Sequence, residues 1–447
     1  MVVNFEGEEI YWQNSAIQSV FSERNVVFND TVADRNMFDV RSSEDFWNWV
    51  RGTFLNSVLR DNYADRSGFF NRYFRILGIV QFRQLRVRND SCTVPPALAV
   101  YVSSCYADFS SISEEVRSYG PSRSGSWKWH TAQELNSQPF TGSTGIVYSG
   151  SGFNISMPLQ YTAAAVLLEG MQQHTWIDLQ TSAVFIDFVV VNPNVKLISL
   201  VKLIFEFPPS SAIKPSASLQ TSKFDSLIPS EGAVSSSEIW LLLQVCLLLI
   251  FELVKLTSLK LLYFRDPWVF LDWWLYCTYI AAFTLRMQPY SFVSQVGWPP
   301  KPDEFVNYES AFAAVSQFKN VIALCSVLSW FKNFKYLQLI PFLSYLMRSI
   351  SCAVGQALPY AVIFVNCIWA FTMAHVLAFG ADMGDYSTAG RAMFTLYRVL
   401  LGEDKFQDMW AFDQVLGPLF YFGWSIVGTF FLAVGRPSRP LYTAWRF

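Results

Sequence analysis

Long apolar runs occur only in the second half of this chain of 447 residues, and no other feature constrains its fold as strongly. Residues 1–235 contain no run long enough to cross a bilayer. Five runs follow, at 239–254, 267–285, 312–331, 358–379 and 415–434. A membrane helix needs about 20 residues to cross roughly 30 Å of hydrocarbon. The pattern predicts an N-terminal domain in water followed by five membrane helices, and the alternative is a large soluble protein with buried helices.

The charge and the short motifs of the chain exclude several functional classes. Lys and Arg number 33 against 35 Asp and Glu, so the chain lacks the positive excess that is typical of nucleic-acid binding. The sequence contains no HExxH, GxxxxGK, CxxC or GxSxG motif, and its three histidines, His130, His174 and His375, lie far apart. We therefore expect no enzyme, no resident metal or cofactor, and no nucleic-acid partner.

The basic residues around the apolar runs concentrate in three loops, which follow the first, third and fifth runs. They are Lys255, Lys260, Arg265, Lys332, Lys335, Arg348, Arg436, Arg439 and Arg446. Basic loops of membrane proteins face the cytosol. The acid-rich segments 288–309 and 380–413 are therefore expected on the opposite side of the membrane, together with the whole N-terminal half.

Glycosylation sequons and cysteines agree with an extracytosolic N-terminal half. The sequons begin at Asn29, Asn89 and Asn154, and none follows residue 235. Cys92 and Cys105 are the only cysteines of this half, and an oxidising compartment would allow them to form a disulfide. The other five cysteines lie in or beside the apolar runs, where we expect them to pack as small apolar residues.

The N-terminal half carries signals for both helices and strands. Ser42 and Asp45 have the spacing of a capping box, and apolar residues at helical spacing follow them. Residues 183–191 and 195–207 are rich in Val, Ile and Phe and are separated by a turn sequence, which predicts a long hairpin. The expected fold class of this half is α+β.

Ordered motifs in both halves resemble the polycystin family of transient-receptor-potential channels. The most distinctive are Arg83-Gln-Leu-Arg-Val-Arg-Asn-Asp-Ser-Cys92, Tyr148-Ser-Gly-Ser-Gly152, Ser329-Trp-Phe-Lys-Asn-Phe-Lys335 and Tyr397-Arg-Val-Leu-Leu-Gly-Glu403. The resemblance covers about residues 5 to 434. It favours polycystins over the related mucolipins, whose extracytosolic domain is similar in layout.

The resemblance implies four segments. These are an α+β extracytosolic domain of the polycystin/mucolipin type at 1–235, an all-α voltage-sensor-like bundle of three spans at 236–340, a pore domain at 341–434 and an atypical tail at 435–447. The family has six spans, so the first would precede Met1, and the family pattern stops near Val434. We therefore expect a chain truncated at both ends.

The resemblance also implies a site. Residues 386–400 would form a re-entrant pore helix, and Leu401, Gly402 and Glu403 the selectivity filter of a tetramer. Four copies of Glu403 would then place a ring of carboxylates at the mouth of the pore. This ring would bind only the permeating cation, which is Ca²⁺, Na⁺ or K⁺.

Four charged residues in the first three spans are candidates for an intramembrane network. Lys332 and Lys335 lie three residues apart on one face of the third span, and Glu252 and Asp272 are expected at similar depth on the other two. Charges at such depth are costly unless they are paired. The alternative is that the lysines extend to the membrane surface.

The expected function is that of a subunit of a tetrameric, non-selective, calcium-permeable cation channel of the polycystin type. The expected partners are membrane lipid and polycystin-family chains, in a homo- or heterotetramer. The expected location is the plasma, ciliary or endoplasmic reticulum membrane. The alternative is a non-conducting subunit or receptor that assembles with other channel chains.

Overall fold

The computed structural model describes residues 7–22, 26–28, 31–33, 36–59, 69–70, 73–121, 125–210, 212–228, 236–266, 268–337 and 339–434. The chain divides into two compact units, Met1–Leu328 and Ser329–Phe447, and each is described by itself. The tail expected at 435–447 and the sequon at Asn29 lie outside the described residues.

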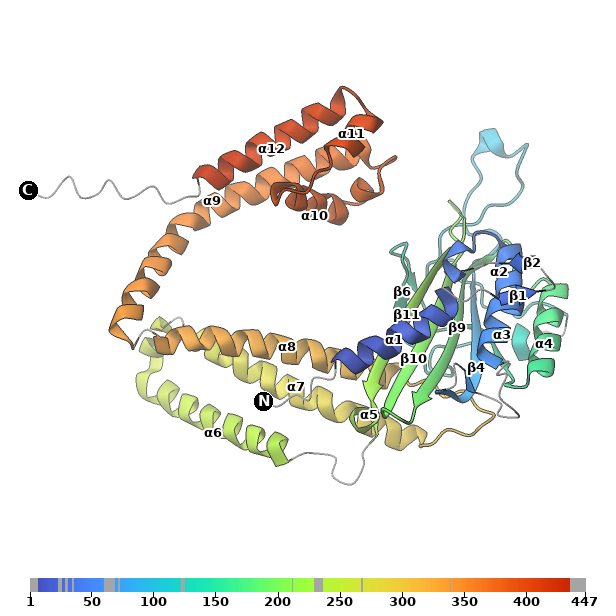
Figure 1. Cartoon of the computed structure of the whole chain (residues 1–447), viewed down its shortest axis with the longest axis horizontal. Coiled ribbons are helices and arrows are strands. Elements are labelled where there is room, and N and C mark those ends of the chain that lie inside the picture. Colours follow the sequence, from blue (N-terminus) through green and yellow to red (C-terminus); the bar gives the residue numbers. More distant parts are fainter. Residues whose placement is uncertain are drawn as a thin grey trace, which may run out of the picture. The chain divides into compact units, whose positions relative to one another are not determined.

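The first unit is built around an antiparallel sheet with the strand order β11-β10-β9-β4-β8-β5, in which β3 also pairs with β4 (Figure 1). The strands are β3 (Phe69–Phe70), β4 (Phe74–Arg86), β5 (Trp129–His130), β8 (Gly152–Met157), β9 (Thr181–Asn192), β10 (Leu197–Glu206) and β11 (Lys214–Lys223). Two small sheets pair β1 (Val26–Phe28) with β2 (Thr31–Ala33), and β6 (Phe140–Thr141) with β7 (Val147–Tyr148). The predicted hairpin is confirmed as β9 and β10.

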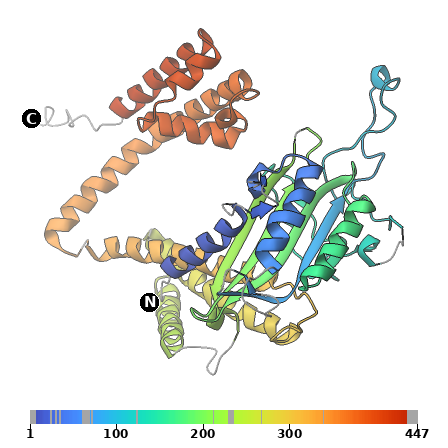
Figure 2. The same ribbon diagram turned by 45° about the vertical axis from the view of Figure 1, so that its right-hand side comes forward.

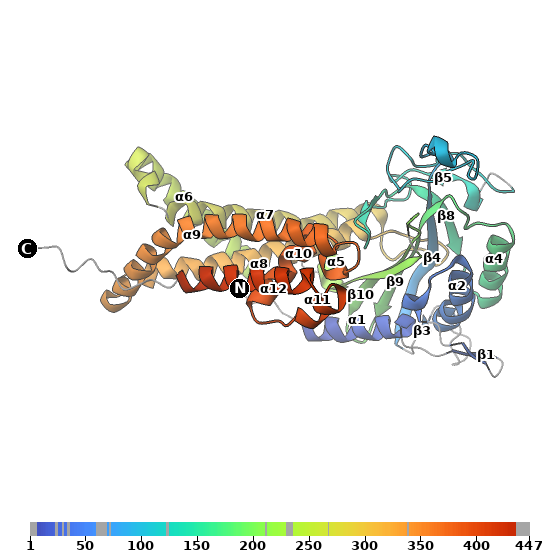
Figure 3. The same ribbon diagram turned by 90° about the horizontal axis from the view of Figure 1, so that it is seen from above.

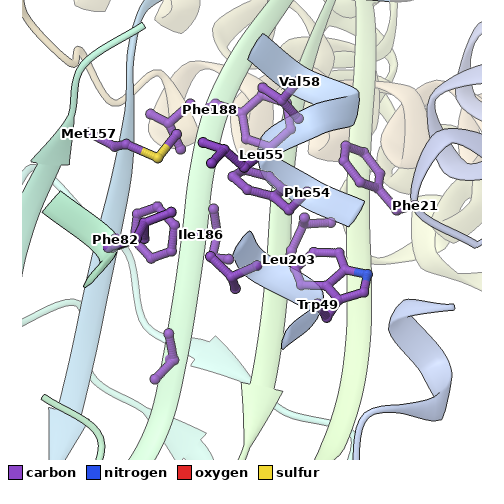
Figure 4. Close-up of a cluster of buried hydrophobic side chains, with 14 of the residues drawn as sticks. Phe21, Trp49, Phe54, Leu55, Val58, Phe82, Met157, Ile186, Phe188 and Leu203 are labelled. Atoms are coloured by element: carbon purple, nitrogen blue, oxygen red, sulfur yellow. The ribbon is translucent and has the colours of Figure 1, made fainter. Parts of the chain in front are cut away.

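Helices cover one face of this sheet (Figure 2). They are α1 (Gly7–Ser22), α2 (Ser43–Trp49), α3 (Leu55–Leu59) and α4 (Tyr161–Gln173). The predicted capping box starts α2, since the Ser42 hydroxyl accepts from Asp45 N and the Asp45 carboxylate accepts from Ser42 N. Helices and strands alike contribute to the core between the layers, including Trp49, Phe54, Phe82 and Phe188 (Figure 4).

The opposite face of the sheet packs against two of the membrane-length helices. After the short α5 (Phe224–Leu227) come α6 (Ser236–Leu259), α7 (Trp268–Val296) and α8 (Glu309–Leu337). Val293 of α7 and Phe312 of α8 pack with Val189 of β9 and Leu200 of β10. One end of α7 and one end of α8 therefore rest on the sheet, as Figures 1 and 3 show.

The second unit contains α9 (Pro341–Phe379), α10 (Ala389–Leu400), α11 (Phe406–Phe412) and α12 (Leu416–Val434). The short α10 packs against both α9 and α12. Ile368, Leu396, Val399 and Trp424 form the core between these three helices. The indole N–H of Trp424 donates to the backbone oxygen of Leu396 over 2.9 Å, which fixes α10 against α12.

Four helical segments of the described chain are long and apolar enough to cross a membrane. They are Glu238–Arg265, Trp268–Gln295, Glu309–Leu337 and Leu358–Phe379. The fifth predicted span corresponds to α12, whose apolar stretch Leu416–Phe431 is shorter. The expected fold class, an α+β domain followed by an all-α membrane region, is confirmed.

Candidate functional site

The three predicted filter residues form the turn that follows α10. The helix begins at Ala389, three residues later than the pore helix predicted at 386–400. Thr388 caps its start, since the Thr388 hydroxyl accepts a hydrogen bond from Arg391 N. It ends at Leu400, and the N–H of Gly402 donates to the oxygen of Val399 over 3.1 Å. The N–H of Glu403 donates to the oxygen of Arg398 over 3.1 Å, so the turn closes back on the helix.

Two glycines allow this turn to form and to lie where it does. Gly402 has φ +101°, a conformation that side chains with a Cβ rarely adopt, although no atom would contact a Cβ there. Gly428 of α12 has a different role, because a Cβ at that position would meet the Leu400 side chain at 1.9 Å. The end of α10 can approach α12 closely only because residue 428 has no side chain.

The Glu403 carboxylate is held by a basic partner that the sequence analysis did not identify. Arg398 donates from Nε and Nη2 to the two carboxylate oxygens. The Lys405 Nζ lies 3.8 Å from the same carboxylate. A cation at this turn therefore meets carboxylates whose charge is partly compensated by the chain itself. The signal was present in the sequence, since Arg398 precedes Glu403 by only five residues.

Lys405 links the filter turn to neighbouring acids. Its Nζ lies 3.1 Å from Asp385 and 3.5 Å from Asp408. The Asp404 carboxylate accepts from Phe406 N over 2.9 Å at the start of α11, so its role there is local. The acid-rich segment 380–413 thus has an internal network of charges rather than a set of bare carboxylates.

The predicted intramembrane charges are only partly brought together. The Glu252 carboxylate is buried in α6 and accepts a hydrogen bond from Lys255 Nζ over 2.9 Å. Lys255, which the charge pattern of the sequence predicts in a cytosolic loop, belongs to α6 because that helix continues to Leu259. Asp272 of α7 is also buried and lies within electrostatic reach of Lys255.

Lys332 and Lys335 occupy the last turns of α8, where both side chains are half-buried. They belong to the second unit, whereas Glu252 and Asp272 belong to the first. Their pairing with these acids stays a prediction.

Cys92 and Cys105 are joined in a disulfide with an S–S distance of 2.03 Å. Asn89 lies just before it in an exposed turn, which suits a glycosylation acceptor. Asn154 lies within β8, where it is half-buried and its Oδ1 is shielded from solvent. Within the described residues, no group of three or more His, Cys, Asp or Glu could hold a metal ion.

Comparisons with known proteins agree on one family. The sequence model of the polycystin domain matches residues 36–225, and that of the polycystin cation channel matches residues 232–433. Together the two matches cover most of the chain.

Similar curated proteins include two named Polycystin-2. The one from Danio rerio is 28% identical over 413 residues, which is 89% of this chain and 46% of that protein. The one from Caenorhabditis elegans is 25% identical over 403 residues, 88% of this chain and 55% of that protein. Polycystin-2-like protein 2 from Mus musculus is 25% identical over 423 residues, 92% of this chain and 67% of that protein. The chain thus spans about half to two thirds of the length of these relatives.

Proposed function

Since the chain belongs to the polycystin cation channel family, we propose that it is a subunit of a tetrameric, non-selective, calcium-permeable cation channel. One observation carries this proposal, namely that the short helix α10, which ends in the glycine turn, packs against the two apolar helices α9 and α12. We assign residues 236–340 to a voltage-sensor-like bundle and residues 341–434 to the pore.

The geometry of α10 supports a cation pathway for a physical reason. A helix carries partial negative charge at its C-terminal end, and α10 presents that end to the turn at Leu401, Gly402 and Glu403. Irregular backbone is tolerated at membrane depth where it lines water, and its carbonyl groups can replace part of the hydration shell of an ion. Four such turns around an axis would combine four helix ends and four Glu403 side chains.

The Arg398–Glu403 pair supports a pore of low selectivity. A ring of unpaired carboxylates would favour divalent ions strongly, because one divalent ion can satisfy several carboxylates at once. Here each carboxylate is accompanied by a guanidinium, which lowers the net charge of the mouth. We therefore propose that Na⁺, K⁺ and Ca²⁺ all permeate.

The proposed location is a membrane, with the sheet domain on the extracytosolic side. The distribution of basic loops, the disulfide and the exposed sequon at Asn89 support this orientation. We propose lipid and other polycystin-family chains as partners, in the plasma, ciliary or endoplasmic reticulum membrane. The names of the relatives support the choice of partner chains.

The test is to express the chain in cells alone and together with a polycystin-family chain, and to record currents under opposing Na⁺ and Ca²⁺ gradients. The proposal expects a cation current that depends on this chain, with measurable entry of both ions. Currents that stay unchanged when Glu403 is replaced would instead favour the alternative, a non-conducting subunit or receptor.

A further inference from the structure

Four charged side chains lie buried together where the sheet meets the start of α8. They are Arg83 of β4, Asp187 of β9, Lys202 of β10 and Glu309, the first residue of α8, and we call them the sheet–helix charge cluster. Their exposed fractions are 0%, 2%, 4% and 7%. Two positive and two negative charges thus lie together where the extracytosolic sheet meets a membrane helix.

Lys202 and Glu309 form the contact between sheet and helix in this cluster. The Lys202 Nζ lies 2.7 Å from Glu309 Oε1. The other oxygen of Glu309 accepts from the Ser137 hydroxyl over 3.2 Å and from Gln138 N over 3.0 Å. Glu309 is therefore held by two segments of the sheet domain that are far apart in the sequence.

The remaining two charges lie beside this pair on the same face. Asp187 is directly opposite Lys202 in the β9–β10 pairing. Arg83 donates to the backbone oxygens of Ser149 and Ser151 over 2.8 and 2.9 Å, and its guanidinium lies 4.1 Å from the centre of the Phe185 ring. These contacts hold Arg83 through its Nη1 atom and through the face of its guanidinium.

The cluster lies between two groups of buried apolar side chains. On one side Val189 and Leu200 pack against Phe312 of α8, and on the other Phe185 and Ile204 form a separate apolar group. Apolar side chains would therefore fit this face of the sheet. Buried ion pairs often contribute no more stability than apolar residues of the same size, but they define which groups must meet. The pair selects one register of α8 against the sheet.

The register of α8 matters because the helix also carries the two voltage-sensor-like lysines. Glu309 and Lys332 belong to one continuous helix, in which Lys332 follows Glu309 by 23 positions. A second contact lies further along the helix, where Lys319 Nζ donates to the backbone oxygen of Thr221 in β11 over 3.3 Å. A shift of the first turn along the helix axis would carry Lys332 and Lys335 with it.

We infer that Lys202 is a positioning residue for α8. Through its pair with Glu309, Lys202 fixes the axial position of this helix, and this position determines the balance between the closed and the conducting state of the channel. The inference rests on the proposed function, because it assigns the positioned helix a role in opening the channel. The partner of α8 in this inference is the sheet of the same chain.

The test is a charge-reversal cycle in the full chain, with Lys202→Glu, Glu309→Lys and the double variant. Each single reversal should shift the voltage at which half of the channels open. We expect the open-to-closed ratio at a fixed voltage to change about 5- to 150-fold, the usual range for coupling between sites. The double reversal should restore most of the wild-type value, because it rebuilds the pair with opposite polarity.

Matched controls use exposed residues of the same region. Lys196 lies in the exposed turn between β9 and β10, and Glu304 lies in the exposed segment just before α8. The control variants are Lys196→Glu and Glu304→Lys. Both should leave the voltage of half-opening unchanged. If the single reversals behave like these controls, or if the double reversal is no closer to wild type than the worse single variant, the inference is wrong.

Two further measurements separate folding and conduction from positioning. If a reversal prevents folding, Lys202→Met, Glu309→Gln and their double variant provide a milder cycle, in which the double variant should be closer to wild type than either single one. If the wild-type chain carries no current, the proposed function fails. Amide hydrogen exchange of residues 309–319 then tests whether Lys202 positions α8, independently of conduction. Faster exchange in both single variants and recovery in the double variant support it, whereas unchanged exchange in the single variants contradicts it.

Discussion

The two ion pairs described above, Lys202–Glu309 in the first unit and Arg398–Glu403 in the second, differ mainly in their access to water. The first is almost fully buried, and its carboxylate has three polar partners. The second lies in a turn, where its side chains are 39% and 33% exposed. Water can replace a lost partner in the second pair but not in the first. We therefore expect charge changes to affect folding in the first unit and ion selection in the second.

The largest effect on the free energy of unfolding is expected when only one partner of the buried Lys202–Glu309 pair is replaced. Replacement of Glu309 by Gln removes the carboxylate that Lys202 Nζ contacts at 2.7 Å, and removing one partner of a buried pair costs about 3–5 kcal/mol of unfolding free energy. Thermal or denaturant unfolding of the purified full chain measures this loss. Glu304→Gln, at an exposed position, is the control, and equal effects of the two changes would remove the contrast between buried and exposed charges.

The next largest effect concerns the disulfide, which stabilises the first unit by a different route. Cys92 and Cys105 are 13 residues apart, and a closed loop of that length contributes about 3 kcal/mol by restricting the unfolded chain. Peptide mapping without reduction should recover the two cysteines linked. The double variant with Ser at both positions should unfold at a lower temperature than wild type. Two free thiols in the folded protein would contradict the prediction.

A third effect is a dependence of stability on pH that arises in the charge cluster. Burial raises the pKa of Asp187 above its ordinary value of 3.8, although Lys202 and Arg83 oppose this shift and Glu309 adds to it. The folded chain therefore binds a proton at Asp187 more readily than the unfolded chain. The contribution of Asp187 to the free energy of unfolding therefore falls as the pH rises from the pKa of Asp187 in the unfolded chain to its higher pKa in the folded chain. The slope is at most about 1.4 kcal/mol per pH unit.

The measurement is the free energy of unfolding against pH for wild type and for Asp187→Asn. The titratable groups that face Asp187 are Arg83, Lys202 and Glu309, and none of them changes in this variant. As the pH falls from neutral toward 4, wild type should gain stability relative to the Asn variant. Parallel curves for the two proteins would show that Asp187 stays ionised in the folded state.

The smallest effect on stability is expected at the filter turn, together with the clearest effect on permeation. Glu403→Gln removes the carboxylate charge and should lower the ratio of calcium to sodium permeability. Arg398→Gln leaves the carboxylate with only the more distant Lys405 as a compensating charge and should raise that ratio. Reversal potentials under calcium and sodium gradients measure both. Unfolding temperatures close to wild type are expected for each, because these side chains are partly exposed.

A pair of controls makes the filter prediction specific. Asp404 and Asp408 are exposed acids further along the same segment, and fields at the surface are screened within about 8 Å at physiological ionic strength. Their Asn variants should change the permeability ratio less than Glu403→Gln does. If all three variants act equally, the overall charge of the segment, and not the Glu403 ring, determines selectivity.

The sequence alone predicted those elements whose signals are local. Apolar runs located the membrane-length helices, two segments rich in Val, Ile and Phe with a turn sequence between them located β9 and β10, and the Ser42–Asp45 spacing located the start of α2. The order of the motifs along the chain was enough to indicate the family. Each of the signals for helices and strands lies within a few tens of residues, where helix and strand periodicity translate directly into structure.

Tertiary structure decided which charges meet. Lys202 and Glu309 are 107 residues apart, and Arg83 and Asp187 lie on strands separated by a long insertion. Only the register of the sheet and the docking of α8 bring them together, and a shift of a strand by one residue would turn Lys202 to the opposite face. Even Arg398 and Glu403, five residues apart, meet because Gly402 turns the chain back on α10. The sequence thus determined where helices and strands lie, whereas the pairing of their charges depends on distances that only the folded chain defines.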